Sequence, residues 1–113
     1  PIITPLDLPD LELSAKFGAA AIKIASCDIN FRDLLEEVSG YGRPVILSTG
    51  ASGRRDIDRA LGYLSKKGSP QVSLLHCVSV YPADISALNL SAIGYLKREF
   101  KLPAGFSDHT KGC

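Results

Sequence analysis

Apolar residues occur along the chain in two alternating patterns, short β-branched runs and longer segments with helical spacing. The short runs predict strands, because β-branched side chains favour an extended, half-buried backbone. The predicted strands are Ile2–Ile3, Ala21–Ala25, Pro44–Leu47, Gln71–Leu75 and Leu102–Phe106.

The segments between these runs place apolar residues three or four positions apart, which predicts four amphipathic helices. Their apolar positions are Leu8, Leu11 and Ala15; Leu34, Leu35 and Val38; Ile57, Ala60, Leu61 and Leu64; and Leu90, Ile93, Leu96 and Phe100. Pro9 suits the first turn of the first helix, and Gly18 suits its end. Asn30 and Ser52 are predicted to cap the second and third helices.

The predicted strands recur with the period of a strand-helix unit. Counted from Ile2, Ile22, Val45, Val72 and Ala104, they begin 20, 23, 27 and 32 residues apart. Strands alternating with helices indicate an α/β fold with a parallel sheet. Two architectures fit, a complete five-stranded doubly wound sheet of the flavodoxin type and an arc of a (β/α)8 TIM barrel. A whole barrel needs roughly 250 residues, so length alone favours the doubly wound sheet.

Composition excludes several classes of function. Thirteen basic and twelve acidic residues give a net charge of +1, and no cluster of Lys and Arg with aromatics marks a nucleic-acid surface. No apolar run approaches the roughly 18 residues of a membrane span, and the first residues lack a signal-peptide pattern. We therefore expect no nucleic-acid partner, no membrane association and a cytoplasmic location.

The cysteines and the chain ends add two expectations. Cys27, Cys77 and Cys113 form no C-x-x-C pair, so we expect buried or incidental thiols rather than zinc or redox chemistry. The chain begins on Pro1 and stops one residue after Gly112 without a closing helix. We expect that it was cut from a longer protein.

Polar residues follow every predicted strand. In chain order they are Thr4; Lys23 and Ser26; Ser48 and Thr49; His76, Ser79 and Tyr81; and Ser107, Asp108, His109 and Thr110. Parallel strands end at one edge of a sheet, which is where α/β proteins bind their ligands. Hydroxyl groups and a lysine gathered there suit a small anion that carries phosphate and carboxylate. Alternatively, any single Ser or Thr caps the helix that follows.

Lys23 lies between Ile22 and Ile24 in an apolar strand. An unpaired ammonium costs several kcal/mol to bury, so a bound anion is the simplest partner. The alternatives are an ion pair with Asp28, a side chain that reaches solvent, and a Schiff-base lysine.

The two histidines predict different roles. His109 follows the last strand within Ser-Asp-His-Thr, a position suited to a metal ligand or an acid/base group, whereas His76 lies in an apolar run and reads as an interior histidine. One histidine does not complete a catalytic metal site. The Gly-rich turn at 48–53 has neither nucleotide-binding fingerprint, which disfavours nucleotide binding.

Five motifs in order and spacing resemble the N-acetylneuraminate (sialic acid) synthase family. They are KIAS at 23–26, PVILSTG at 44–50, LHCVSVYP at 75–82, NL at 89–90 and FSDHTKG at 106–112. The resemblance runs from Thr4 to Gly112 and favours the barrel over the flavodoxin type. It implies that residues 1–113 are the central segment of the barrel, about its third to seventh strands. The family's first, second and eighth strands and its C-terminal antifreeze-like domain would then be absent.

The resemblance also implies a ligand set. Phosphoenolpyruvate would be held by Thr4, Lys23, Ser26, Ser48, Ser79, Tyr81 and Ser107. Family members carry Asn or Ser at the position of Ser79, and Tyr81 would also border the sugar. A divalent metal, Mn²⁺ or Mg²⁺, would bind His109 and a second histidine outside this chain. Lys23 and His109 would be the catalytic residues.

The implied activity is condensation of phosphoenolpyruvate with an open-chain N-acetylated hexose, with release of phosphate. The sugar, N-acetylmannosamine or a diacetamido sugar, is left open, and the full-length enzyme is expected to be a homodimer. The isolated segment is expected to be inactive. A Schiff-base aldolase on another phosphate-handling barrel and a complete flavodoxin-like binding domain are the alternatives.

Overall fold

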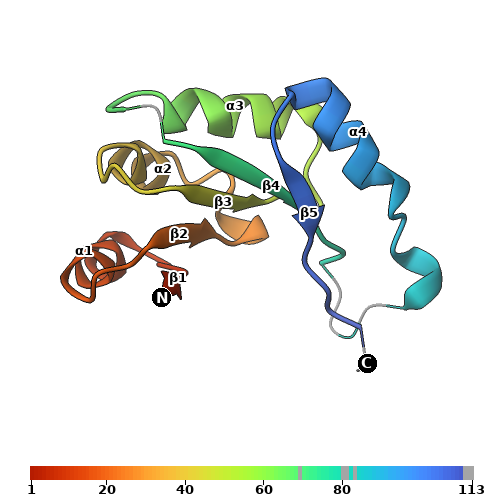
Figure 1. Cartoon of the computed structure of the whole chain (residues 1–113), viewed down its shortest axis with the longest axis horizontal. Coiled ribbons are helices and arrows are strands. Elements are labelled where there is room, and N and C mark those ends of the chain that lie inside the picture. Colours follow the sequence, from red (N-terminus) through yellow and green to blue (C-terminus); the bar gives the residue numbers. More distant parts are fainter. Residues whose placement is uncertain (69, 80–81, 83, 111–113) are drawn as a thin grey trace.

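The computed structural model describes residues 1–68, 70–79, 82 and 84–110. Strands and helices alternate along the chain (Figure 1). In order they are β1 (Ile2–Ile3), α1 (Leu8–Lys16), β2 (Ala21–Ile24), the 3-10 turn η1 (Ser26–Asp28), α2 (Arg32–Ser39), β3 (Val45–Ser48), α3 (Arg54–Leu64), β4 (Val72–His76), the 3-10 turn η2 (Ile85–Ala87), α4 (Ser91–Phe100) and β5 (Ala104–Phe106). The predicted α/β fold is confirmed.

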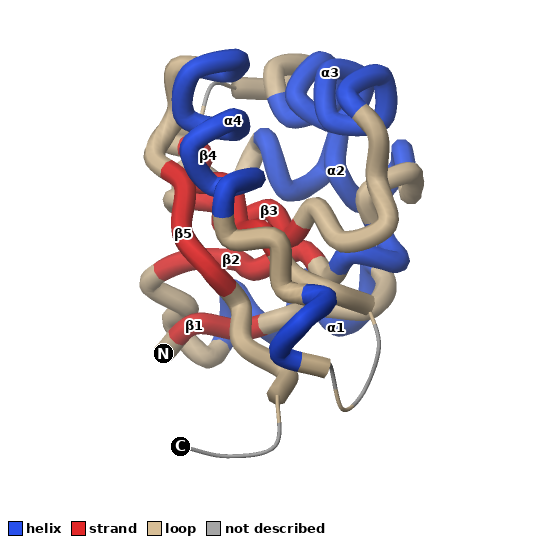
Figure 2. Tube along the Cα trace, turned by 90° about the vertical axis from the view of Figure 1, so that its right-hand side faces the viewer, coloured by secondary structure: helices blue, strands red, loops and turns tan. Residues whose placement is uncertain are grey.

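The strands form one parallel sheet in the order β1-β2-β3-β4-β5. A flavodoxin-type sheet has the order 2-1-3-4-5, so the sequential order excludes that alternative. Sequential parallel strands with right-handed crossovers place every connecting helix on the same face of the sheet. The strand order can be followed from β1 to β5 in Figure 1, and Figure 2 shows β5 running steeply relative to β1 and β2, as in a curved sheet. The structure is an arc of a (β/α)8 barrel, as the motif resemblance implied.

One hydrophobic core joins the sheet to its helices. Side chains alternate between the two faces of a strand, and Ile22 and Ile24 of β2 are 1% and 0% exposed because they face the helices. The core cluster combines such strand residues with residues of all four α-helices and of two connecting segments: Leu11, Ala19, Ile22, Ile24, Ile29, Leu34, Leu35, Val38, Val45, Leu47, Ile57, Ala60, Leu64, Leu74 and Leu96.

The other face of the sheet is less covered. Ile2 is 60% exposed, and Lys23, Ile46 and Leu75 are half-buried although they lie in strands. In a complete barrel this face is the packed interior. The uneven burial of the two faces is therefore what an arc of a barrel should show.

The helix ends agree with the sequence patterns only in part. Asp7 caps α1 by accepting a hydrogen bond from the Asp10 N–H, and Gly18 has a φ of 67° as expected of the residue that reverses the chain. The predicted caps Asn30 and Ser52 are wrong. The N-cap of α2 is Phe31 and that of α3 is Gly53, and neither Asn30 nor Ser52 occupies the capping position.

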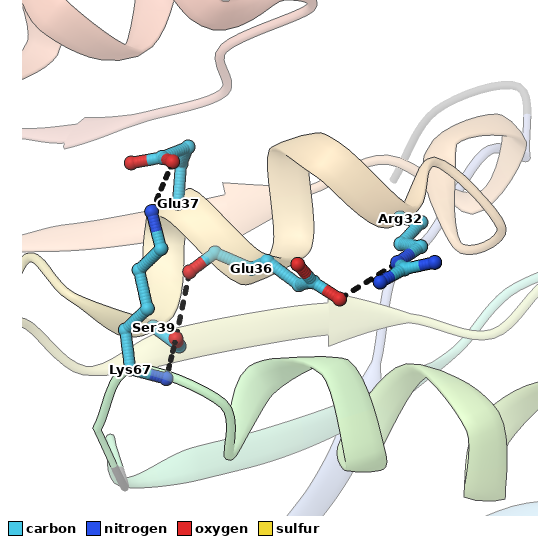
Figure 3. Close-up of polar contacts among 5 residues, drawn as sticks. All are labelled: Arg32, Glu36, Glu37, Ser39 and Lys67. Atoms are coloured by element: carbon cyan, nitrogen blue, oxygen red, sulfur yellow. Dashed lines mark hydrogen bonds and ion pairs between the residues drawn. The ribbon is translucent and has the colours of Figure 1, made fainter.

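A hydrogen-bonded cluster ties α2 to the loop before β4 at the edge opposite the strand ends (Figure 3). The Ser39 hydroxyl donates to the Glu36 carbonyl at 2.7 Å and accepts from the Lys67 N–H at 2.9 Å. The Lys67 ammonium forms an ion pair with Glu37. A Cβ on Gly68 would lie 2.5 Å from the Ser39 carbonyl oxygen, so a glycine is required for this close approach. These contacts join the end of α2 to the loop that leads into β4.

Candidate anion site at the carboxyl ends of the strands

Five of the predicted ligand residues follow the strands at one edge of the sheet. Thr4 and Ser107 come directly after β1 and β5, Ser26 comes two residues after β2, and Ser79 comes three residues after β4. Ser48 is the last residue of β3 and is 3% exposed. Because the sheet is parallel throughout, all five lie along the same rim. Tyr81, the remaining predicted ligand, lies outside the described residues.

Gly50 is the point where three of the strand ends meet. A Cβ built on Gly50 would lie 2.4 Å from Ser79 Oγ, 2.7 Å from Cys77 Sγ and 2.9 Å from Ser26 Oγ. The Gly50 N–H donates to Ser26 Oγ at 3.0 Å, and Ser26 Oγ and Cys77 Sγ are also hydrogen-bonded at 3.0 Å. Hydroxyl groups from the segments that follow β2 and β4 thus surround one point on the turn after β3.

A cavity of about 260 Å³ opens beside this junction. Its lining mixes polar and apolar groups and includes the hydroxyls of Ser26, Ser52 and Ser79. Asp56 also lines it, and this carboxylate already accepts a hydrogen bond from the Gly53 N–H at 3.0 Å. The volume lies just below the roughly 300–1,000 Å³ of pockets that hold drug-sized ligands, so a small metabolite is the appropriate size of guest.

Lys23 lies on the face of the sheet that the helices do not cover. Its neighbours Ile22 and Ile24 point into the core, so Lys23 projects from the opposite face. It pairs in register with Ile46 of β3, and one more step of the β1–β2 register places Thr4 beside it. The Lys23 side chain is half-buried. A cation on this face, next to the hydroxyl-bearing rim, is what a site for an anion requires.

Ser107 and His109 form a second hydrogen-bonded unit on the rim. His109 Nδ1 lies 3.1 Å from the Val78 carbonyl oxygen, and Nε2 lies 3.2 Å from Ser107 Oγ. A carbonyl only accepts, so Nδ1 carries the proton and the lone pair of a neutral ring is on Nε2. The Ser107 N–H donates to the His76 carbonyl at 2.9 Å, which anchors this unit to β4. The intervening Asp108 has its pKa lowered, first by the hydrogen bond from the Thr110 N–H.

His76 has the interior role that the sequence indicated. Its Nε2 is hydrogen-bonded to the Leu88 carbonyl oxygen at 2.6 Å, and its ring packs on Phe106 with centroids 6.0 Å apart. It is half-buried and lies in β4. His76 therefore holds the segment before α4 against the sheet.

Sequence reasoning missed Gly50 and Cys77 as parts of the site. The turn that contains Gly50 was considered for nucleotide binding and as part of a family motif, and Cys77 was read as a buried or incidental thiol, but neither was assigned to the site. Cys77 is indeed buried, at 4% exposure, but its sulfur contacts a predicted ligand. A glycine directly after two polar strand-end residues was the available signal, since it marks a close approach of other groups to the backbone.

Comparison with known proteins decides the family. The sequence matches the NeuB family over residues 1–113. The chain belongs to the NeuB family.

Relatives in this family carry related names. The chain is 39% identical to N,N'-diacetyllegionaminic acid synthase of Campylobacter jejuni, covering 96% of this chain and 33% of the relative. Its structure matches N-acetylneuraminic acid (sialic acid) synthetase from Leptospira borgpetersenii with a TM-score of 0.89 and 46% identity, covering 96% of this chain and 38% of the other. The chain spans about a third of the length of the curated relatives it matches.

A more distant neighbour shares the fold. DAHP synthase from Thermotoga maritima superposes with a TM-score of 0.81 at 21% identity, over 96% of this chain and 33% of that one. In the described part of this NeuB chain, no helix is long and apolar enough to cross a bilayer.

A complete metal site is absent from the part of the chain that the structure describes. No three His, Cys, Asp or Glu side chains within it are placed to hold an ion together. His109 nevertheless has the features of a metal-binding histidine, because its Nδ1–H donates to a backbone carbonyl and fixes both the tautomer and the ring orientation. His109 therefore fits one ligand position of a metal site that other residues would complete.

Cys27 lies on the cavity lining, and its surroundings predict a thiol that reacts slowly with alkylating agents. Cys27 is exposed, but desolvation by its surroundings, followed by the charge and hydrogen bonding of Asp28, raises the pKa of its thiol. A raised pKa means less thiolate at neutral pH, and the thiolate is the nucleophile. We expect iodoacetamide to alkylate Cys27 more slowly than a Cys in an unstructured peptide at pH 7.5, with the difference closing as the pH rises.

The Asp28→Asn variant tests the cause. Removing the carboxylate charge lowers the Cys27 pKa and should speed alkylation, whereas Asp33→Asn, in the first turn of α2, should not. Peptide mapping by mass spectrometry isolates Cys27 from the other thiols. An Asp28→Asn protein that reacts no faster would show that the carboxylate does not control this thiol.

Proposed function

We propose that the protein containing this chain condenses phosphoenolpyruvate with an N-acetylated hexose and releases phosphate. The observation that carries the proposal is the gathering of Ser26, Ser79 and the Gly50 turn around one point beside a small cavity that both serines line. The family membership and the names of the relatives support the class of reaction. In this proposal residues 1–113 supply about the third to seventh strands of the barrel.

The anion would be held by one positively charged side chain and by hydroxyl groups that donate hydrogen bonds. Lys23 balances the charge of phosphoenolpyruvate, and the hydroxyls of Thr4, Ser26, Ser48, Ser79 and Ser107, together with Tyr81, donate hydrogen bonds to it. Donors fixed before the substrate arrives cost little reorganisation when charge develops on the departing phosphate. The Leptospira relative was crystallised with citrate, another small multivalent anion.

A divalent metal, Mn²⁺ or Mg²⁺, would be held by His109 and by a second ligand outside this chain. When bound, it would polarise the sugar aldehyde. The task of the described residues is to keep His109 oriented through the Nδ1–H bond to the Val78 carbonyl. Ser107, whose Oγ lies 3.2 Å from Nε2, would have to leave that nitrogen free for the metal. The proposal also includes a cytoplasmic homodimer as the working form.

The sugar belongs to a class that the relatives define only broadly. Named relatives include synthases of diacetyllegionaminic acid and pseudaminic acid and an N-acetylneuraminate-9-phosphate synthase. Two of these names denote N-acetylated products, which supports an N-acetylated sugar as the acceptor. We therefore propose N-acetylmannosamine or a diacetamido hexose as the acceptor.

An isotope experiment on the full-length protein tests the reaction. Phosphoenolpyruvate labelled with ¹⁸O at the bridging position is incubated with Mn²⁺ and each candidate sugar, and the released phosphate is analysed by mass spectrometry. Condensation with C–O cleavage leaves the label in phosphate, and phosphate release should depend on the sugar. Sugar-independent release with unlabelled phosphate would indicate a phosphatase instead. Covalent trapping at Lys23 by borohydride would indicate an aldolase.

The 113-residue chain by itself is expected to be catalytically silent and to self-associate. A five-stranded arc has two open edges and one half-covered face, and such edges pair with other chains. The site also depends on groups that the proposal places outside this chain. Light scattering and a phosphate-release assay with Mn²⁺ measure both properties, and an active monomer would contradict the proposed assignment to the middle of the barrel.

A further inference from the structure

The Ser26 hydroxyl is held by two neighbours that belong to other strand ends. The Gly50 N–H, on the turn after β3, donates to Ser26 Oγ at 3.0 Å. Cys77 Sγ, just past β4, lies 3.0 Å from the same oxygen. Ser26 itself begins η1 after β2, so residues 24 and 51 positions away in the sequence fix one side chain.

Counting donors shows what these neighbours do to the Ser26 proton. A serine hydroxyl has one proton and two lone pairs. The Gly50 N–H has no accepting ability and therefore occupies one lone pair. The contact with Cys77 can run either way. If Ser26 donates to the sulfur, its only proton is used. If the thiol donates to Ser26, both lone pairs are filled and the proton must point elsewhere.

A bound anion selects the second arrangement. Sulfur is a weak acceptor, whereas hydrogen bonds to phosphate or carboxylate oxygens are about twice as strong as neutral ones. Ser26 lines the cavity beside Gly50, so its proton can turn toward a guest there. Cys77 is 4% exposed and lines another cavity with Thr49 and His76. Its sulfur lies 3.0 Å from Ser26 Oγ, so its thiol proton is within reach of Ser26.

Gly50 makes this arrangement sterically possible. Any side chain at position 50 would place its Cβ within 3 Å of Ser26 Oγ, Cys77 Sγ and Ser79 Oγ. Such distances essentially never occur between a Cβ and these atoms, so the three groups would have to separate. The constraint is space rather than backbone conformation, because Gly50 is absent from the positive-φ residues.

We propose that the Cys77 thiol and the Gly50 amide are positioning groups that turn the Ser26 hydroxyl into an obligatory hydrogen-bond donor toward the substrate anion. The inference rests on the proposed function, since it takes phosphoenolpyruvate as that anion. Cys77 acts through Ser26 and does not touch the substrate itself.

The test measures phosphoenolpyruvate binding to the full-length protein by isothermal titration calorimetry, without sugar. Cys77→Ser keeps a donor at the position, and Cys77→Ala removes it. We expect the alanine variant to bind about tenfold more weakly and the serine variant to stay within about threefold of the parent. The Cys77→Thr and Cys77→Val pair, equal in shape and different only in the hydroxyl, repeats the comparison if the alanine variant unfolds.

A double-mutant cycle separates positioning from packing. If Cys77 acts through Ser26, the Ser26→Ala, Cys77→Ala double variant should bind no more weakly than Ser26→Ala alone. Additive losses would overturn the inference, as would equal losses in the serine and alanine variants or an alanine variant that binds like the parent. A parent protein that binds no phosphoenolpyruvate at millimolar concentration would overturn the proposed function, and the inference with it.

Discussion

Replacing Lys23 with alanine in the full-length protein is expected to lower kcat/KM for phosphoenolpyruvate by roughly 30-fold to several thousandfold. This range corresponds to the about 2 to 5 kcal/mol lost when one partner of a desolvated charge pair is removed. Lys23 projects from the sheet face opposite the helices, with Ile22 and Ile24 buried on the other side, so its charge faces the proposed substrate and not the core. Thermal stability should change little, because the side chain is only half-buried.

Two further variants define the role of the charge. Lys23→Arg keeps the cation and should retain more phosphoenolpyruvate use than Lys23→Ala. Lys66→Ala removes an exposed lysine that follows α3 near the opposite edge of the sheet and should leave the kinetics unchanged. If Lys23→Ala turns over normally with saturating metal and sugar, Lys23 has no part in the mechanism.

The sequence predicted the elements of the fold better than their arrangement. All five predicted strands exist, because β-branched runs between helical patterns are strong local signals. Strand order is not local: a flavodoxin-type sheet and a barrel arc have the same strand-helix period, and only the order β1-β2-β3-β4-β5 separates them. Without the motif resemblance, chain length would have favoured the wrong architecture.

Helix caps were the least predictable local feature. Asn30 Oδ1 accepts from the Arg59 guanidinium at 3.4 Å, and α2 begins one residue later than this cap would require. Ser52 donates its hydroxyl proton to the Gly50 carbonyl at 3.2 Å. Both side chains are engaged by tertiary or turn contacts that a sequence window does not contain, so their general preference for N-caps was overridden.

The sequence identified the residues of the candidate site better than the contacts among them. Thr4, Ser26, Ser48, Ser79 and Ser107 were identifiable because each follows a predicted strand, and their common rim then follows from a parallel sheet. The contacts among Ser26, Gly50 and Cys77 were not identifiable, since they depend on the register of three strands and on the absence of a side chain at one position. The role assigned to Tyr81 stays a prediction, because that residue lies outside the described part of the chain.

His109→Ala is expected to abolish metal-dependent turnover of the full-length protein, with a loss of at least about 100-fold, the upper range seen when only an outer partner of a metal ligand is removed. The Nδ1–H bond to the Val78 carbonyl places the lone pair of the ring on Nε2, where Ser107 also lies. Titration with Mn²⁺, followed by electron paramagnetic resonance of the free ion, measures binding independently of turnover.

The matched control for His109 is His76, since the chain contains two histidines. His76 Nε2 is hydrogen-bonded to the Leu88 carbonyl within the fold, so His76→Gln, which keeps a donor near that position, should lower thermal stability and leave Mn²⁺ affinity unchanged. If His109→Ala bound Mn²⁺ like the parent, the hydrogen bond from His109 to Val78 would serve only to join the loop after β5 to the end of β4. If His109→Ala loses Mn²⁺ binding and His76→Gln keeps it, the hydrogen bond from His109 to the Val78 carbonyl serves to orient a metal ligand.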